Sequence, residues 1–247
     1  MKKLTITLLA AVLLTAGTVP SAQAAVEVTG GAYVGVYDKY LWRGFDLSGS
    51  KPVVQTGVDL SAKGFTLSYW SNLQTRDADS AGLESGEITE TDIVLDYSTD
   101  LNDLLAVSVG NIFYNLDGLD DTNELYLGLT VNTLLSPNLT VYWDYDEAKG
   151  DGLFVTGSVG HTFTVTDQLG INLGALISYN YGSDYSLGTE EGHHGWHNYE
   201  LSVSADYALT ENLAISPSLL YSSGLSSAAK NNLDSEFLAG LNLGFTF

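Results

Sequence analysis

The sequence predicts an all-β protein, a transmembrane antiparallel up-and-down β-barrel of about twelve strands with short periplasmic turns and longer extracellular loops. Three observations lead to this fold class. Apolar residues alternate with small or polar ones along many segments, the connections between these segments alternate in length, and the chain ends carry export and membrane signals. The mean hydropathy of only +0.07 agrees, because barrel strands face lipid on one side only.

The last segment of the chain shows the alternation most clearly. Every second position from Phe237 to Phe247 is apolar, and the residues between them are small or polar except Leu238. Successive residues of a strand point to opposite faces, so one face is apolar and the other is not. The same period predicts strands at 26–42, 53–62, 64–73, 88–98, 104–115, 125–131, 139–145, 153–163, 169–180, 199–207 and 213–221.

The connections favour a membrane barrel over a soluble periplasmic sandwich. Every second connection is tight, as at Lys63-Gly64 and Thr210–Asn212, and those between them are mostly longer and more polar, as at 75–87 and 181–196. Outer-membrane barrels sort their loops in this way, and a sandwich has no reason to do so. Because the non-apolar rows are rich in Gly, Ser, Thr and Asn, we expect a wet lumen.

The two chain ends predict export to the outer membrane of a Gram-negative bacterium. A basic head, an apolar run and Ala22-Gln23-Ala24 indicate a signal peptide over residues 1–24, which leaves 25–247 as a single barrel domain. The alternating apolar residues Leu243, Phe245 and Phe247 match the terminal insertion signal of such barrels. The expected partners are therefore outer-membrane lipid and, during biogenesis, the barrel-insertion machinery and periplasmic chaperones.

Composition argues against several other functions. The formal net charge is −21, from 30 acidic and 9 basic residues, whereas nucleic-acid binding needs clustered Lys and Arg. No phosphate loop, dinucleotide fingerprint or nucleophile elbow occurs in the chain. We expect no cofactor, no catalytic residue and no enzymatic activity.

Residues 40–46 (YLWRGFD) followed by 51–59 (KPVVQTGVD) resemble the TorF family of outer-membrane porins. The resemblance implies a barrel that acts as a channel for passive diffusion of small hydrophilic solutes. The alternative function is a non-conducting barrel with a structural role, or one whose loops bind a ligand or a partner.

Charged residues on the inward rows are candidates for the lumen and its constriction. Parity places Arg43 on the inward side near the outer end of the first strand, and it places carboxylates on inward rows of other strands: Asp59, Asp92, Asp144, Glu200 and Asp206. Arg43 facing carboxylates could sort solutes by charge, and an open acidic lumen would then prefer cations. Alternatively, the same residues form a structural ion-pair network that fills a small lumen. The polar long loops favour an unplugged barrel.

Three histidines in the longest predicted loop, His193, His194 and His197, are weak candidates for a Zn²⁺ or Cu²⁺ site. Their spacing is not that of a helical metal motif, and histidine-rich tracts are compositional signals only. We therefore expect no metal.

Overall fold

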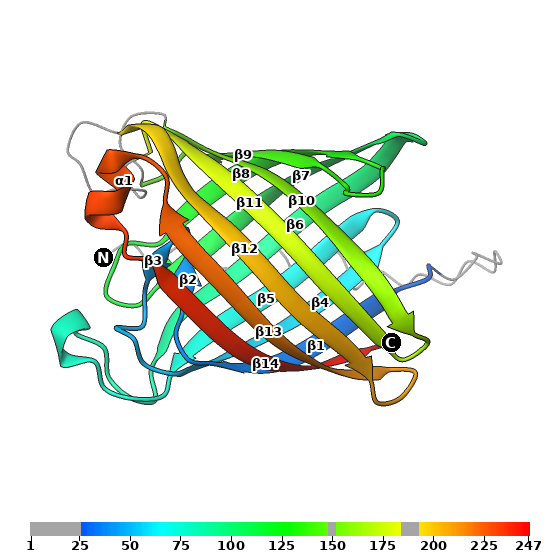
Figure 1. Ribbon diagram of the computed structural model, residues 1–247, viewed down its shortest axis with the longest axis horizontal. Coiled ribbons are helices and arrows are strands. Elements are labelled where there is room, and N and C mark those ends of the chain that lie inside the picture. The colour runs from blue at the N-terminus through cyan, green and yellow to red at the C-terminus, as the bar shows by residue number, and fades with distance from the viewer. Residues whose placement is uncertain (1–25, 148–151, 184–192) are drawn as a thin grey trace, which may run out of the picture.

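A computed structural model describes residues 26–147, 152–183 and 193–247, so the predicted signal peptide lies outside the described residues. Twelve long strands close into one antiparallel barrel, as predicted (Figure 1). Closure occurs at the first strand, which pairs with the second long strand on one edge and with the last strand on the other. The strands are β1 (Thr29–Tyr37), β4 (Val53–Ala62), β5 (Phe65–Gln74), β6 (Ile88–Asn102), β7 (Leu105–Leu116), β8 (Thr122–Val131), β9 (Asn138–Asp144), β10 (Leu153–Thr166), β11 (Leu169–Tyr181), β12 (His194–Ala208), β13 (Leu213–Gly224) and β14 (Glu236–Thr246).

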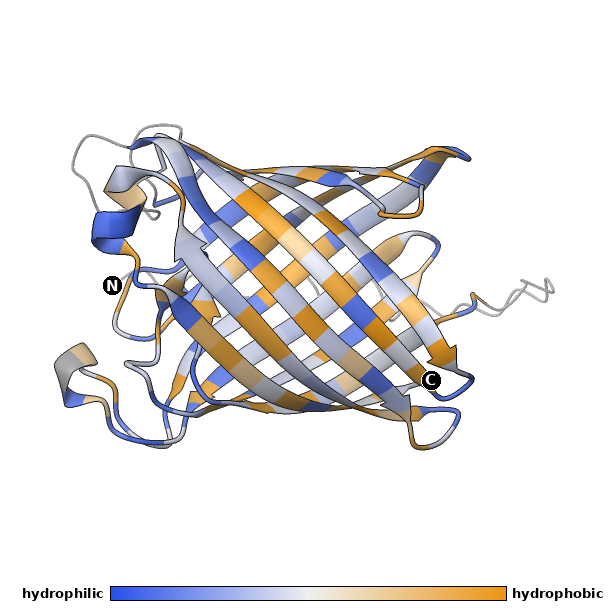
Figure 2. Ribbon diagram, viewed as in Figure 1, coloured by the Kyte–Doolittle hydropathy of each residue, from blue (hydrophilic) through white to orange (hydrophobic). Residues whose placement is uncertain are grey.

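The distribution of polarity is the reverse of that in a soluble protein. Large apolar side chains on the strands are exposed, for example Leu127 at 56% and Leu201 at 52%. Figure 2 shows the alternation of hydrophobic and hydrophilic residues along each strand. The largest fully buried side chains are mostly polar: His197, Gln74, Val53, Asn72, Asn180 and Asn198. An apolar outside around a polar inside is the arrangement of a barrel that spans a membrane.

The connections are sorted by side, as predicted. Turns such as Asp103-Leu104 and Asp167-Gln168 are tight, whereas the longest connections, such as 38–52, 75–87 and 225–235, lie at the opposite end of the barrel. That end also carries the short elements η1 (Asp79–Ala81) and α1 (Ser227–Asn232), and Figure 1 shows α1 at the end opposite the C-terminus. Within the described ranges, no helix has the length and apolar character to cross a membrane.

The first strand is shorter than predicted. It ends at Tyr37 rather than near residue 42, because Asp38 closes the pairing with β14 through its backbone N–H and its carboxylate, both bonded to Ala239. The chain then forms a small separate hairpin, β2 (Leu41–Trp42) and β3 (Phe45–Asp46). Arg43 therefore lies on a loop, at the tip of this hairpin, and not on the first strand.

The hairpin tip explains why the alternation was misleading here. Arg43 and Gly44 both have positive φ, 49° and 85°, as the two central residues of a tight type I′ turn do. Tyr40 and Trp42 continue the even-numbered apolar row of Val34 and Val36, so the segment looks like an extension of the first strand even though the chain has left the barrel wall. We call residues 38–52 the lumen loop.

Candidate lumen constriction

The lumen loop folds into the barrel. The Tyr40 ring lies 5.4 Å from that of Trp70 on β5, and the Trp42 ring lies 6.4 Å from that of Tyr114 on β7. The Phe45 ring lies 5.8 Å from the imidazole ring of His197 on β12. One short hairpin can reach strands on opposite sides of the barrel only from the inside. The expectation of an unplugged barrel is therefore wrong for the outer end, because the aromatic residues of the loop supply the apolar anchors.

Arg43 and Glu124 form an ion pair inside the lumen. Arg43 Nη2 lies 2.8 Å from both carboxylate oxygens of Glu124, which projects inward from β8. The two side chains are only 9% and 4% exposed. The Tyr114 hydroxyl also donates to Glu124 Oε2 at 2.8 Å. A buried charge is tolerated when it is paired and hydrogen-bonded in this way.

Aromatic rings enclose the guanidinium of Arg43. Its central carbon lies 4.3 Å from the ring centre of Trp42, 4.2 Å from that of Phe154 and 5.3 Å from that of Tyr142. These distances are within the range of cation–π attraction. Arg43 Nη1 is buried and has no hydrogen-bond partner within the described part of the chain. The guanidinium therefore lies between the hairpin and the stretch of wall formed by β8, β9 and β10.

His197 fixes the turn of the lumen loop. Its Nε2 lies 2.8 Å from the carbonyl oxygen of Arg43, so Nε2 donates and carries the proton. A bulge where Ile177 and Tyr179 of β11 pair with β12 allows consecutive residues of β12, His197 and Asn198, both to be buried. His197 thus lies on a strand in the lumen and not in the predicted loop.

The histidines are not gathered into one site. His194 is exposed and lies edge-on to Tyr181, whereas His197 is 0% exposed between Phe45 and Phe154. His193 stands just before β12. In the ranges that the structure describes, no three His, Cys, Asp or Glu side chains are placed to hold a metal ion.

Further hydrogen bonds fix the rest of the lumen loop. The Asp46 carboxylate accepts from the backbone N–H and the hydroxyl of both Ser48 and Ser50, at 2.6 to 2.9 Å. Burial opposes ionisation of Asp46, but these hydrogen bonds outweigh it and lower its pKa. Lys39 pairs with Glu236 at 2.6 Å, which ties the loop to the start of β14.

The other predicted lumen residues all lie on inward rows, since their strand neighbours are exposed on the outside, but they lie at different depths. Asp144 is 3% exposed, accepts a 2.7 Å hydrogen bond from Thr122 and lies beside the Arg43 pair. Glu200 lines the lumen just below the hairpin. Asp206 is exposed near the periplasmic end. Asp59 and Asp92 complete the set on β4 and β6.

Sequence reasoning missed Glu124, Glu90 and Tyr114 as lumen candidates. Glu124 alternates with outward-facing Leu125, so the parity that identified Asp144 would have identified it too. The pairing of Glu124 with Arg43, by contrast, depends on the hairpin entering the lumen. No local pattern in the sequence predicts that the hairpin enters the lumen.

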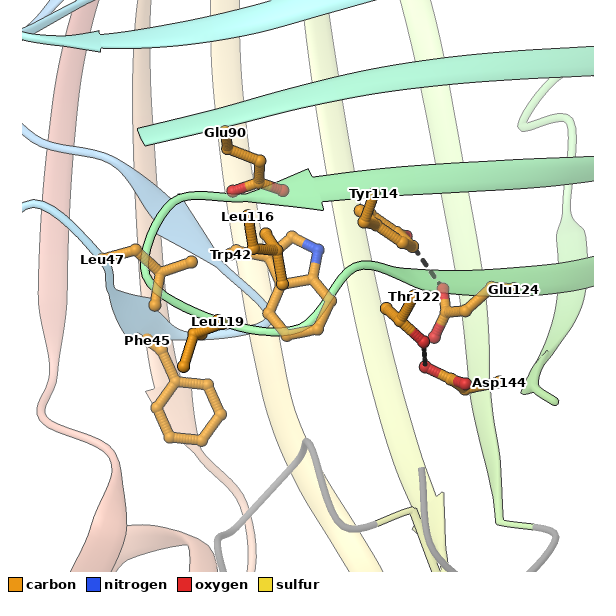
Figure 3. Close-up of a pocket in the computed structure, with 10 residues that line it drawn as sticks. All are labelled: Trp42, Phe45, Leu47, Glu90, Tyr114, Leu116, Leu119, Thr122, Glu124 and Asp144. Carbon is orange, nitrogen blue, oxygen red and sulfur yellow. Dashed lines mark hydrogen bonds between the residues drawn. The ribbon is translucent and has the colours of Figure 1, made fainter. Parts of the chain in front are cut away.

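Two cavities flank the hairpin and share Trp42 and Tyr114. The outer one has a volume of about 380 Å³ and is shown in Figure 3. The inner one has a volume of about 320 Å³. The outer cavity is lined by Trp42, Phe45, Leu47, Glu90, Tyr114, Leu116, Leu119, Thr122, Glu124 and Asp144. The inner cavity is lined by Trp42, Arg43, Ile112, Tyr114, Tyr142, Phe154, Thr156, Leu176, Asn198 and Glu200.

The twelve barrel strands carry no Lys or Arg, although they carry many carboxylates. These are Asp59, Glu90, Asp92, Asp96, Asp100, Glu124, Asp144, Glu200, Asp206 and Glu236. Arg43 reaches the lumen only on the inserted loop, and its charge is offset by Glu124. The wall of the lumen is therefore formally anionic along its length.

Comparison with protein families gives one match. The model of the Gcw_chp family, described as a bacterial protein of unknown function, matches residues 21–212. The matching family is thus Gcw_chp, and no comparison supports the TorF name. Among curated proteins no relative matches the chain.

Three solved structures that share the fold are outer-membrane channels. The NanC porin aligns with a TM-score of 0.55 at 13% identity, over 89% of this chain and 99% of that one. The KdgM porin aligns with a TM-score of 0.54 at 13% identity, over the same shares. The COG4313 outer membrane channel from Pseudomonas putida F1 aligns with a TM-score of 0.55 at 13% identity, over 94% of this chain and 100% of that one. At this identity the likeness shows the fold alone.

Proposed function

The chain belongs to the Gcw_chp family and has the fold of outer-membrane channels, and from this premise we propose that it forms a channel in the Gram-negative outer membrane. Small hydrophilic solutes diffuse through it passively, and cations pass more readily than anions. Transport is favoured over catalysis because the three solved structures compared above are channels.

The charge of the lumen wall is the observation that carries the cation preference. The strands contribute carboxylates and no Lys or Arg, and the one Arg on the inserted hairpin is paired with Glu124. A passage lined by one sign of charge raises the local concentration of ions of the opposite sign. Cations therefore accumulate in the lumen, and anions are repelled.

The lumen loop sets the size limit in this proposal. A barrel of about twelve strands lies between the small filled barrels of about eight strands and the open porins of about sixteen. The hairpin occupies its outer end, so solutes pass beside the cluster formed by Arg43, Trp42 and Tyr142. Only small solutes fit such a passage.

The KdgM porin has also been solved in complex with disordered oligogalacturonate, an acidic sugar chain. A polyanion of that kind would meet carboxylates on every side of this lumen. We therefore propose cationic or neutral solutes for this channel rather than acidic sugars.

Reversal potentials in planar bilayers test the proposal. Under a KCl gradient, the purified full barrel should conduct with a reversal potential of the sign that reports preference for K⁺ over Cl⁻. Liposome swelling with neutral sugars of increasing size should show a low size limit. Preference for Cl⁻ would contradict the cation selectivity, and absence of both conductance and swelling would contradict the channel.

A non-conducting barrel is the second candidate function, and the degree to which the lumen loop is fixed favours it. The loop is tied to β14 by Lys39, to β12 by His197 and to β8 by Arg43, so it could act as a permanent plug. In that case the wild-type barrel should not conduct, whereas a variant whose residues 41–46 are replaced by Gly and Ser should conduct.

Membrane insertion is the remaining part of the proposal. Leu243, Phe245 and Phe247 are 40%, 46% and 56% exposed, on the lipid-facing row of the last strand and just beyond it. We propose that this row is the signal that the barrel-insertion machinery reads.

A further inference from the structure

We propose that the extracellular segment 225–235, which contains α1, holds the lumen loop inside the barrel, so that the two segments open and close the outer end together. We call residues 225–235 the latch. The contact between the latch and the lumen loop rests on the fold alone, whereas its meaning as a gate rests on the proposed channel.

The sequence of the latch forms one short helix with one apolar side. The Ser226 hydroxyl caps this helix by accepting the backbone N–H of Ala229 at 3.0 Å, and Ser is among the residues preferred at this position. Leu233 follows Ala229 by four residues, so the two side chains lie on the same side. They are only 5% and 0% exposed, although the latch lies at the aqueous end of the barrel.

The apolar side of the latch packs against the tip of the lumen loop. The ring of Phe45 packs against the cluster formed by Ala229 and Leu233. A Cβ atom added to Gly44 would lie only 3.3 Å from Leu233 Cδ1, so the turn of the hairpin and the latch are in close contact. Figure 1 shows α1 at the outer end of the barrel, the end at which β2 and β3 also lie. The latch therefore covers the hairpin from outside.

Both ends of the latch are also tied to the lumen loop. At its start, the backbone N–H of Leu225 donates to the carbonyl oxygen of His197 at 2.8 Å, and the imidazole of the same histidine donates to the Arg43 carbonyl. Just beyond its end, Glu236 pairs with Lys39 at 2.6 Å. The latch is thus connected to the lumen loop at its start, its middle and its end.

Neither segment is long enough to be stable without the contacts that surround it. The helix α1 has six residues, and isolated helices shorter than about 12 residues are marginal in water. The strands β2 and β3 have two residues each, and an isolated two-stranded hairpin is at best marginally stable. Each segment is ordered partly by the other, and such a coupling is reciprocal. Loosening the latch should therefore release the hairpin.

The two segments can move without breaking the barrel. The ladder between β13 and β14 reaches Ser222 and Glu236, and the ladders of β1 reach Tyr37, so neither the latch nor the lumen loop is part of the wall. Local opening of such segments needs less free energy than global unfolding. A gate built from them opens the outer end while the strands stay paired.

Limited digestion of the refolded full barrel with trypsin tests the coupling. Trypsin cuts after Lys and Arg, which the barrel strands lack, so the Arg43–Gly44 bond reports on the hairpin and the Lys230–Asn231 bond reports on the latch. Leu233→Asn removes the apolar side of the latch and leaves the Arg43–Glu124 pair in place. It should accelerate cleavage of both bonds at least about tenfold relative to the wild type.

Two further variants support the interpretation. Leu119→Asn is the matched control, because this leucine lies on another extracellular loop and is 70% exposed, and both bonds should be cut as slowly as in the wild type. Ala229→Asn changes the same cluster at a second position, which is 0% exposed, and should act as Leu233→Asn does. It tests the latch even if Leu233→Asn fails to fold.

The outcomes separate the latch from the proposed channel. Unchanged cleavage at Arg43–Gly44 in the latch variants would overturn the latch, whether or not Lys230–Asn231 is cut faster. In planar bilayers, the open fraction of Leu233→Asn should exceed that of Leu119→Asn, and equal open fractions would overturn the gate while leaving the channel. Faster cleavage of both bonds, with no conductance in any variant, would leave the latch and overturn the channel.

Discussion

The outer and periplasmic halves of the lumen are built from the same alternating strands, yet they differ in packing. In the outer half, Asn72, Glu124 and Asn198 are buried at 0%, 3% and 1% exposure against the lumen loop and its neighbours. Near the periplasmic end, inward residues such as Asp100 and Asp206 are exposed. Inward side chains of the barrel wall thus stay accessible to solvent near the periplasmic end, and they are covered at the outer end, where the lumen loop enters.

Removing the hairpin should have the largest effect and would make the two halves alike. Replacement of residues 41–46 by Gly and Ser should raise single-channel conductance several-fold, because the outer half loses the segment whose rings contact β5, β7 and β12. Bilayer recording measures the change. A variant with the same replacement in the periplasmic turn at Asn132–Pro137 should conduct as the wild type does. Unchanged conductance in the hairpin variant would mean that the narrowest point lies elsewhere.

The next largest effect should come from Glu124→Gln, which leaves the Arg43 charge buried without its partner. Breaking a buried ion pair costs about 3–5 kcal/mol. We expect this cost to exceed the free energy that keeps the short hairpin in the lumen. The hairpin should leave the lumen and expose the Arg43–Gly44 bond, and trypsin should then cut it in the folded barrel. Glu84→Gln, an exposed loop residue, should remain uncut at this site. Resistance of the Glu124→Gln variant would show that the aromatic contacts suffice to hold the loop.

The fold was predictable from the sequence because it depends on a signal that repeats. The alternation of apolar and polar residues is visible within each strand. The alternation of short turns with longer loops then predicts the up-and-down topology, and no long-range contact is needed. The inward position of Asp59, Asp144 and Glu200 follows from the same parity. Strand ends were less well predicted, since Asn102 and Thr166 extend their strands beyond the apolar rows.

The constriction was not predictable because it depends on contacts between residues far apart in the chain. Arg43 is 81 residues from Glu124, and its carbonyl is bonded by a histidine 154 residues away. The hairpin turn at Arg43 and Gly44 carries a positive φ at a non-glycine residue, which the alternation does not reveal. The bulge that turns His197 inward likewise interrupts the period on which the prediction relied.

One histidine in each half of the barrel contacts a backbone carbonyl, His197 in the outer half and His161 in the periplasmic half. Replacing them should have a smaller effect than the two changes above. His197→Phe retains an aromatic ring between Phe45 and Phe154 but leaves the buried Arg43 carbonyl without its donor, at a cost of about 1–3 kcal/mol. His161→Phe removes a 2.9 Å contact to the Leu134 carbonyl in an exposed turn and should cost much less. Amide hydrogen exchange should accelerate at the hairpin tip only in the first variant. Equal protection in both would assign the tip's order to the Arg43–Glu124 pair alone.

Removing one carboxylate charge from each half of the lumen tests which half sets the ion selectivity. Glu200→Gln, just below the hairpin, should reduce the preference for K⁺, because the carboxylate borders the narrow inner cavity. Asp206→Asn, exposed near the periplasmic end, should change the reversal potential less, since water and salt screen charges across a wide mouth over about 8 Å at physiological ionic strength. A larger effect of Asp206→Asn would place the selective region in the periplasmic half.

The smallest effect should appear on acidification and should be confined to the lumen loop. The pKa of Asp46 is lower in the folded protein than in the unfolded chain, where it is about 3.9. The stability that the Asp46 carboxylate contributes is therefore fully present above the unfolded pKa and is lost as pH falls through the lower folded pKa. Protonation removes the acceptor that holds Ser48 and Ser50, and the loop should loosen below about pH 4. Single-channel current noise recorded from pH 7 to pH 3 should rise in the wild type. In Asp46→Asn, which keeps one acceptor oxygen but cannot titrate, the noise should be higher at neutral pH and should lose this pH dependence. A rise of equal size in that variant would assign the acid response to carboxylates of the barrel wall.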